Sequence, residues 1–258
     1  MVHRKDQIID LHAHVLPGLD DGPGRLEEAV ELLKLLERDG VGTVVATPHV
    51  APGFFWPYDP ARMEDKLAEL RQAAAAAALE IEVIGGAENY LSPEVVQLAE
   101  QGRLPTLGDS RYVLVEFPRR EVPFWGFEAL ERLQRSGYRP ILAHPELNDQ
   151  IRADAELPSD LVRQGVLLQL DASSLAGRWG SRVADFASSL LQSGLGHLVA
   201  SDAHSARRPP EFRAARQALA RVTDRRTAQR LLCDAPAAVV QGVLIEPERR
   251  SVGARKEA

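Results

Sequence analysis

Short runs of β-branched and apolar residues alternate along this chain with longer amphipathic segments. This alternation predicts parallel strands connected by crossover helices, which is typical of an α/β fold. We expect strands at residues 8–11, 43–47, 81–84, 112–116, 140–144, 166–170 and 197–201.

Helix signals lie between the expected strands. Apolar residues recur at helical spacing from Leu26 to Leu36, and Gly40 follows as a C-terminal cap. Asp59 and Pro60 supply an N-cap and a first-turn proline for the next helix, which continues into the alanine tract at 73–78.

The chain of 258 residues shows no internal repeat and no linker rich in proline, glycine and serine. Barrels of the α/β class commonly use this length as one domain. We therefore expect a single domain at residues 1–246 and a loose, charged C-terminal tail at 247–258.

Composition excludes several classes of partner. A net charge of -6 argues against binding to nucleic acid or insertion into an anionic membrane surface, so any bound phosphate must be attracted by a local charge. The single cysteine, Cys233, excludes a disulfide within the chain and favours a reducing compartment. With no signal-peptide core and no apolar run of membrane-spanning length, we expect a cytoplasmic protein.

Metal-ligand side chains follow six of the seven expected strands. Parallel strands of a barrel bring their C-terminal ends to one mouth, so residues far apart in sequence meet there. The candidates, in chain order, are His12, His14, His49, Glu88, Glu116, His144, Asp202 and His204.

Any one of these histidines, taken alone, is more often a hydrogen-bonding residue than a ligand. Together they are difficult to explain structurally, because carboxylates crowded at one mouth repel each other unless cations lie between them. His3, near the N-terminus, and His197, at the opposite end of its strand, are expected not to be ligands.

Several motifs carry a family resemblance. They are His12-Ala13-His14, Leu16-Pro17-Gly18-Leu19-Asp20-Asp21-Gly22, Thr47-Pro48-His49, His144-Pro145-Glu146 and Ser201-Asp202-Ala203-His204 with Arg208-Pro209-Pro210. The chain resembles the polymerase and histidinol phosphatase (PHP) superfamily, and within it the capsule-type bacterial protein-tyrosine phosphatases. The resemblance implies a distorted (β/α)7 TIM-like barrel with three divalent ions, usually manganese, held by the eight candidates above and Asp21. Asp20 is the alternative to Asp21 if the loop register differs by one.

The expected chemistry is hydrolysis of a phosphomonoester by metal-bound hydroxide. Nitrogen and oxygen donors without thiolates suit manganese, iron or zinc, and clustered metals activate water for in-line displacement. Three dications and four carboxylates leave a charge of roughly +2, which attracts a phosphate dianion. Cys233 lacks the loop of cysteine-dependent phosphatases, so that route is excluded.

The resemblance assigns Arg208 to phosphate binding, with Arg207 as its neighbour, and Asp202 and His204 to the catalytic centre. Arginine suits this role because its planar fork matches phosphate oxygens. The family's arginine after the fifth strand is replaced by Leu147, unless Arg119, Arg120, Arg152 or Arg178 reaches the site from a loop.

Ten of the fourteen aromatic residues follow strands, including Phe55 and Trp56. They are consistent with a rim that binds a phosphoaryl substrate, and equally with small cores inside long loops. Asp20 and Glu146 are candidate proton donors to the leaving group.

The function predicted is that of a protein-tyrosine phosphatase acting on phosphotyrosine proteins. The resemblance alone suggests a bacterial tyrosine kinase of polysaccharide export as the partner. Two alternatives stay open: a PHP phosphatase for a small metabolite such as histidinol phosphate, and a metal-binding regulatory module with weakened catalysis.

Overall fold

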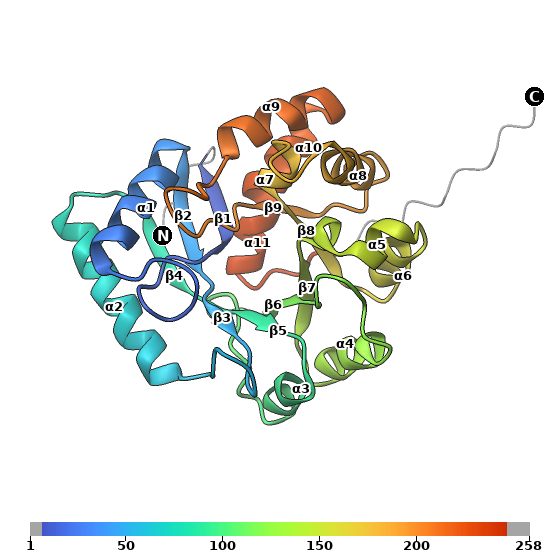
Figure 1. The fold of residues 1–258 in the computed structure, drawn as a ribbon, viewed down its shortest axis with the longest axis horizontal. Coiled ribbons are helices and arrows are strands. Elements are labelled where there is room, and N and C mark those ends of the chain that lie inside the picture. Colours follow the sequence, from blue (N-terminus) through green and yellow to red (C-terminus); the bar gives the residue numbers. More distant parts are fainter. Residues whose placement is uncertain (1–6, 247–258) are drawn as a thin grey trace, which may run out of the picture.

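The computed structural model describes residues 7–246, and the predicted tail at 247–258 lies outside this range. Strands form the centre of the molecule and helices surround them (Figure 1). The strands are β1 (Ile8–Ala13), β2 (Val41–Ala46), β3 (His49–Val50), β4 (Glu82–Gly85), β5 (Glu88–Tyr90), β6 (Tyr112–Glu116), β7 (Arg139–Ala143), β8 (Leu167–Asp171) and β9 (Leu198–Ala200).

Most of the helices connect one strand to the next, as the alternating pattern predicts. They are α1 (Leu26–Arg38), α2 (Pro60–Ala76), α3 (Pro93–Glu100), α4 (Gly126–Arg135), α5 (Asp149–Ala153), α6 (Leu157–Arg163), α7 (Ala172–Leu175), α8 (Ser181–Gln192), α9 (Phe212–Val222), α10 (Arg225–Gln229) and α11 (Ala235–Val240), with a 3-10 helix η1 (Pro145–Leu147) and a π-helix η2 (Arg230–Asp234). The side chain of Asp59 caps α2 as expected, because it accepts a hydrogen bond from the backbone N–H of Arg62.

Every strand pairing in the two sheets is parallel. One sheet has the order β1-β2-β4 and the other β3-β5-β6-β7-β8-β9. The two ends of the strand series meet where Ala13 forms a bridge with Ala203, just beyond β9. The α/β class and the parallel arrangement predicted from the sequence are therefore confirmed.

Two predicted strands differ from the observed ones because the backbone breaks within them. The strand expected at 43–47 is followed after Pro48 by the separate short strand β3, and the strand after 81–84 resumes as β5, which was not predicted. Pro48 has no N–H to donate to a ladder. At the second break, a side chain at Gly86 would meet the Val45 side chain at 2.6 Å, so the chain passes very close to β2.

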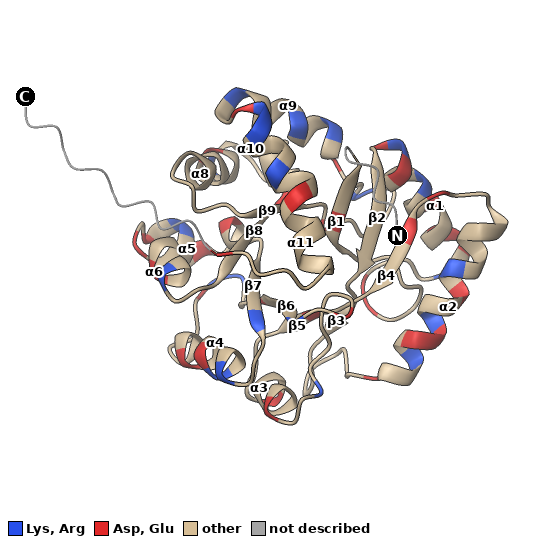
Figure 2. Cartoon of the chain, turned by 180° about the vertical axis from the view of Figure 1, so that it is seen from behind, with Lys and Arg blue, Asp and Glu red and all other residues tan. Residues whose placement is uncertain are grey.

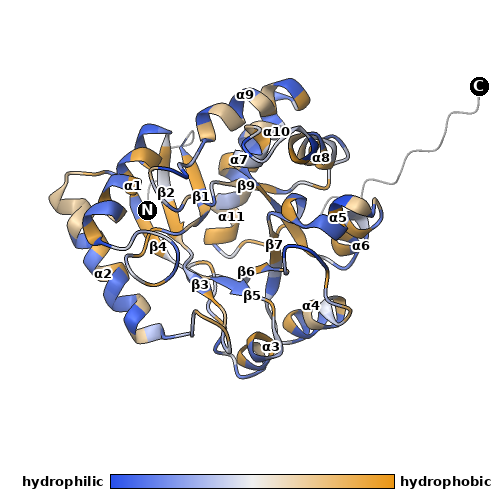
Figure 3. Ribbon diagram, viewed as in Figure 1, coloured by the Kyte–Doolittle hydropathy of each residue, from blue (hydrophilic) through white to orange (hydrophobic). Residues whose placement is uncertain are grey.

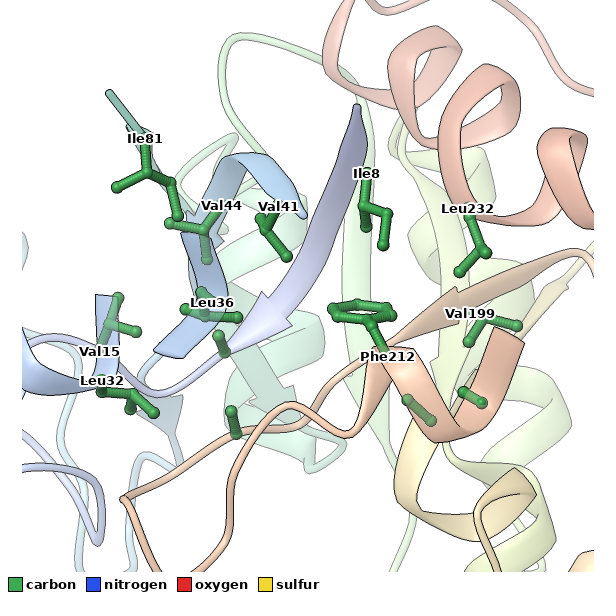
Figure 4. Close-up of a cluster of buried hydrophobic side chains, with 14 of the residues drawn as sticks. Ile8, Val15, Leu32, Leu36, Val41, Val44, Ile81, Val199, Phe212 and Leu232 are labelled. Carbon is green, nitrogen blue, oxygen red and sulfur yellow. The ribbon is translucent and has the colours of Figure 1, made fainter. Parts of the chain in front are cut away.

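The core consists of apolar faces of the strands packed against the inner faces of the helices. Figure 3 shows apolar colouring on most strands, whereas the helices carry it on one side only. In the cluster of Figure 4, Phe212 at the start of α9 packs with Ile8 of β1 and Val199 of β9. This packing holds β1 and β9 together and so positions the loops that follow them.

Among the described residues, no helix combines the length and the apolarity that a membrane crossing requires.

Candidate metal centre

The predicted ligands come together at the C-terminal ends of the strands. Among the described residues, three groups place their ligand atoms within 4.8 Å of one another. The groups are His14, Asp21, His49 and His204; His12, His14, Glu88 and Asp202; and His49, Glu88 and Glu116. Since His14, His49 and Glu88 each belong to two groups, the three groups form one continuous cluster.

His144, the ninth predicted ligand, lies beside these groups without belonging to them. Its Nε2 is 2.9 Å from Oε1 of Glu88 and 4.0 Å from Oε2 of Glu116. All nine residues therefore lie in one place, although seven different loops and strands supply them.

Glu88 is at the centre of the cluster. Its Oε2 lies 3.2 Å from Nε2 of His12, 3.3 Å from Nε2 of His14 and 3.1 Å from Nδ1 of His49. Nevertheless, Glu88 Oε2 and His49 Nδ1 are buried without a partner in hydrogen-bonding geometry. Buried polar atoms are rarely left in this state, and a cation bound between them would satisfy both.

Hydrogen bonds orient three of the imidazoles. His12 Nδ1 lies 2.9 Å from Oε1 of Gln169, His14 Nδ1 lies 2.6 Å from Oδ2 of Asp20, and His204 Nδ1 lies 2.8 Å from the carbonyl oxygen of Asp202. Because these oxygens only accept, Nδ1 carries a hydrogen, and Nε2 is the nitrogen that faces the cluster and can bind a cation. Metal-binding histidines are typically held in this way.

Two candidate ligands, His144 and Asp202, have strained backbone conformations. His144 has φ of 34° and Asp202 has φ of 50°, both in the left-handed region that residues other than glycine seldom adopt. His144 directly follows β7, and Asp202 lies two residues after the end of β9. Such strain is retained where the surrounding structure requires a particular side-chain direction.

Asp10 fixes the relative position of the first and last strands. Its carboxylate accepts hydrogen bonds from the backbone N–H and the hydroxyl of Ser201, at 3.0 and 2.6 Å. Burial raises the pKa of Asp10 to about 6, although these hydrogen bonds oppose the shift. The residue therefore joins strand β1, which carries His12, to the loop that carries Asp202.

The electrostatic field at the cluster favours cations. Burial alone would lower the pKa of His144, but its hydrogen bond with Glu88 raises it to about 10. For Glu88 the directions are reversed: burial would raise its pKa, but the charges of His12 and His49 bring the pKa well below its usual range. Carboxylates that stabilise protons on imidazoles also stabilise a divalent cation that displaces those protons.

Asp21, and not Asp20, belongs to one of the three groups of candidate ligands. Asp21 Oδ1 lies 3.2 Å from His204 Nε2, whereas Asp20 accepts hydrogen bonds from His14 and from the backbone N–H of His49. Asp20 thus orients His14, a candidate ligand. Glu146, the other candidate proton donor, is fully buried and accepts a hydrogen bond from the backbone N–H of Asp171.

Arg208 reaches the centre, where its guanidinium group forms an ion pair with Asp202. Arg207 is exposed. Arg152 instead binds the carbonyl oxygen of Glu146, and Arg178 binds Glu211, so neither points into the cluster.

The two aromatic residues predicted to bind substrate differ in their surroundings. Trp56 stacks on His49 with ring centroids 4.5 Å apart, whereas Phe55 is 88% exposed. Trp56 therefore covers one side of the cluster, and Phe55 is available at the surface.

His197 lies away from the cluster, where it is buried and accepts a hydrogen bond from the backbone N–H of Leu168. Burial lowers its pKa to about 4. His3 falls outside the described residues.

Sequence reasoning missed Gln169 and Asp171. Gln169 orients His12, and Asp171 accepts a hydrogen bond from the indole of Trp179. The available signal was a glutamine and an aspartate within the otherwise apolar run at 167–171, since a buried polar side chain requires a partner.

The fold and the cluster define a class: α/β proteins of parallel strands whose loops gather metal-ligand side chains at one mouth. Within that class, the chain belongs to the family of capsular polysaccharide synthesis, CpsB/CapC, whose family model matches residues 8–241. The resemblance predicted from the sequence is confirmed.

Individual relatives agree with this assignment. The tyrosine-protein phosphatase YwqE of Bacillus subtilis is 35% identical over 198 residues, covering 77% of this chain and 78% of YwqE. The tyrosine-protein phosphatase CpsB of Streptococcus pneumoniae is 30% identical over 248 residues, covering 92% of this chain and all of CpsB.

Solved structures show the same relationship. A structure from the work on YwqE and CpsB, described as unique metal-dependent tyrosine phosphatases, superposes with a TM-score of 0.86 at 31% identity, covering 94% of this chain and 100% of that one. A mutant organophosphorus hydrolase from Deinococcus radiodurans has a TM-score of 0.60 at 17% identity, covering 92% and 93% of the two chains, and shares the fold alone.

Proposed function

We propose that this protein is a metal-dependent protein-tyrosine phosphatase that hydrolyses phosphotyrosine in proteins. The observation that carries the proposal is the single cluster of five histidines and four carboxylates with Arg208 at its edge. Relatives that cover most of the chain are named tyrosine-protein phosphatases, which supports the same reaction.

The proposed ligands are the nine residues of the cluster, and the proposed cofactor is three divalent ions, with manganese first and iron or zinc as alternatives. Nitrogen and carboxylate donors without thiolates fit such ions. When bound, they supply a positive field for the phosphate and lower the pKa of water for attack on phosphorus.

The chain's own residues then have distinct tasks. Arg208, from the loop after β9, binds phosphoryl oxygens through its guanidinium fork. Asp202 and His204 bind metal beside it. Asp20 and Gln169 orient the imidazoles of His14 and His12, respectively. Phe55 and Trp56 offer aromatic surface to the tyrosyl leaving group.

We further propose that β2 with β3, and β4 with β5, each count as one interrupted strand, so that the nine strands of residues 7–246 form a distorted (β/α)7 barrel. Residues 1–246 are then one domain. A cytoplasmic tyrosine kinase system of polysaccharide export is the proposed setting, because the family is described by capsular polysaccharide synthesis.

Hydrolysis of a phosphotyrosine peptide, a phosphoserine peptide and histidinol phosphate tests the proposal. We expect turnover of the phosphotyrosine peptide above the others, loss of activity after chelation and recovery with manganese.

Arg208→Ala should lower kcat/KM by about two orders of magnitude, whereas Arg216→Ala, at an exposed arginine on α9, should not. Absence of phosphotyrosine hydrolysis with every metal, or activity that survives chelation, would contradict the proposal.

A further inference from the structure

One exposed tryptophan brings together two arginines from different loops. The guanidinium carbons of Arg119 and Arg208 lie 5.4 and 5.6 Å from the ring centroid of Trp179. Both distances are within the range of a cation–π interaction. Arg119 comes from the loop between β6 and α4, and Arg208 from the loop between β9 and α9.

The indole of Trp179 is fixed in place. Its Nε1–H donates to Oδ2 of Asp171 at 2.7 Å, and Asp171 is only 1% exposed. The other carboxylate oxygen accepts from the backbone N–H of Ser173, and the backbone N–H of Asp171 donates to Glu146. Since Asp171 makes these three hydrogen bonds, the tryptophan ring that it binds has little freedom to turn.

The loop that carries Trp179 is also tied to the loop that carries Arg208. Arg178 donates to the carboxylate of Glu211 and to the carbonyl oxygen of Arg207. The relative position of Trp179 and Arg208 is therefore set by these contacts of Arg178 as well as by the contact of Arg208 with the ring.

Arg119 lies close to the position where the family resemblance places an arginine. Together with His144 and Leu147, it lines a small hollow of about 10 Å³. Leu147 is 6% exposed, so the hollow is lined here by an apolar side chain. The backbone carbonyl of Arg119 accepts a hydrogen bond from the N–H of Asp149 at 2.9 Å, which holds the arginine loop against the same turn.

We propose that Arg119 is the second phosphate-binding arginine of this chain and that Trp179 is the residue that positions it beside Arg208. The inference rests on the proposed phosphatase function and adds the group that compensates for Leu147. Two guanidinium forks bind the oxygens of one phosphoryl group better than one, because each donates paired N–H groups.

The test compares Arg119→Ala with Arg120→Ala, an exposed arginine one position further along. In metal-loaded protein, the first variant should raise the KM for a phosphotyrosine peptide by about ten-fold, the size expected from loss of a charged hydrogen bond. It should weaken binding of inorganic phosphate, measured by calorimetry, by the same factor. Added guanidinium ion should partly restore Arg119→Ala, and Arg120→Ala should match the wild type throughout.

Two further variants separate positioning from simple stability. Trp179→Leu should raise KM when made alone, but should raise it less when combined with Arg119→Ala. Trp179→Phe, which keeps an aromatic face, should retain more of the affinity for phosphate than Trp179→Leu. Leu147→Arg should restore phosphate affinity to Arg119→Ala. Equal phosphate affinity in Arg119→Ala and Arg120→Ala would overturn the inference, whereas a wild type that binds phosphate but hydrolyses no phosphotyrosine would overturn the proposed function alone.

Discussion

At the scale of single residues, the centre depends on side chains that contact ligands as much as on the ligands themselves. The convergence of the candidate ligands could be predicted because each follows a strand within a short motif, such as His12-Ala13-His14. Gln169 could not, because its role depends on β8 lying where its amide meets His12 across the centre of the molecule. A single sequence reveals the donor types, but tertiary contacts decide which groups orient them.

Gln169→Leu is predicted to weaken metal binding. The amide oxygen is the only partner that holds Nδ1 of His12, among the contacts of the described residues, and loss of such a partner typically costs 10–100-fold in affinity, by order of magnitude. Competition with a chelator of known affinity measures the effect.

Gln97→Leu, on the exposed side of α3, is the matched control and should bind metal as the wild type does. If Gln169→Leu retained wild-type affinity, the assigned role of this hydrogen bond would be wrong.

At the scale of elements, the breaks in the strands shape the site. β5 is short and hydrophilic (Figure 3), so no apolar alternation marks it, yet it begins with Glu88 at the centre of the cluster. The break before it depends on the approach of Gly86, which lies between β4 and β5, to Val45 of β2. Strand positions could therefore be predicted from apolar runs, but these interruptions could not.

Gly86→Ala is predicted to destabilise the protein and disturb the centre. The added methyl group would meet Val45 at 2.6 Å, and overpacking of this kind costs about 1–3 kcal/mol in the free energy of unfolding. Denaturant titration measures the loss, and a metal titration should show weaker binding because Glu88 lies two residues further along.

Gly24→Ala serves as the control, since its nearest neighbour would be 3.7 Å away and its stability should change by less than about 0.5 kcal/mol. Equal stability of the two variants would show that the close approach at Gly86 is unimportant.

At the scale of the whole molecule, the chain has a negative net charge although its proposed substrate is also an anion. Acidic and basic residues are distributed over the outer helices (Figure 2), and the chain as a whole carries -6. An anionic substrate must therefore be attracted by a local field from bound cations and arginines.

The particular contact that joins the first strand to the last was beyond prediction from the sequence. The α/β class followed from the alternation of apolar runs and helices. The contact between β1 and β9 instead depends on Asp10 and Ser201, which are 191 residues apart in sequence and look unremarkable in isolation. It is this contact that brings the first and last ligand motifs together.

The central claim is that the nine residues hold several divalent ions in one place. Anomalous diffraction from crystals of the purified protein, combined with elemental analysis, tests it most directly. We predict more than two equivalents of manganese, iron or zinc per chain, with each ion bound among the residues of the cluster. One equivalent or less after growth with these metals, or ions bound elsewhere on the molecule, would contradict the account.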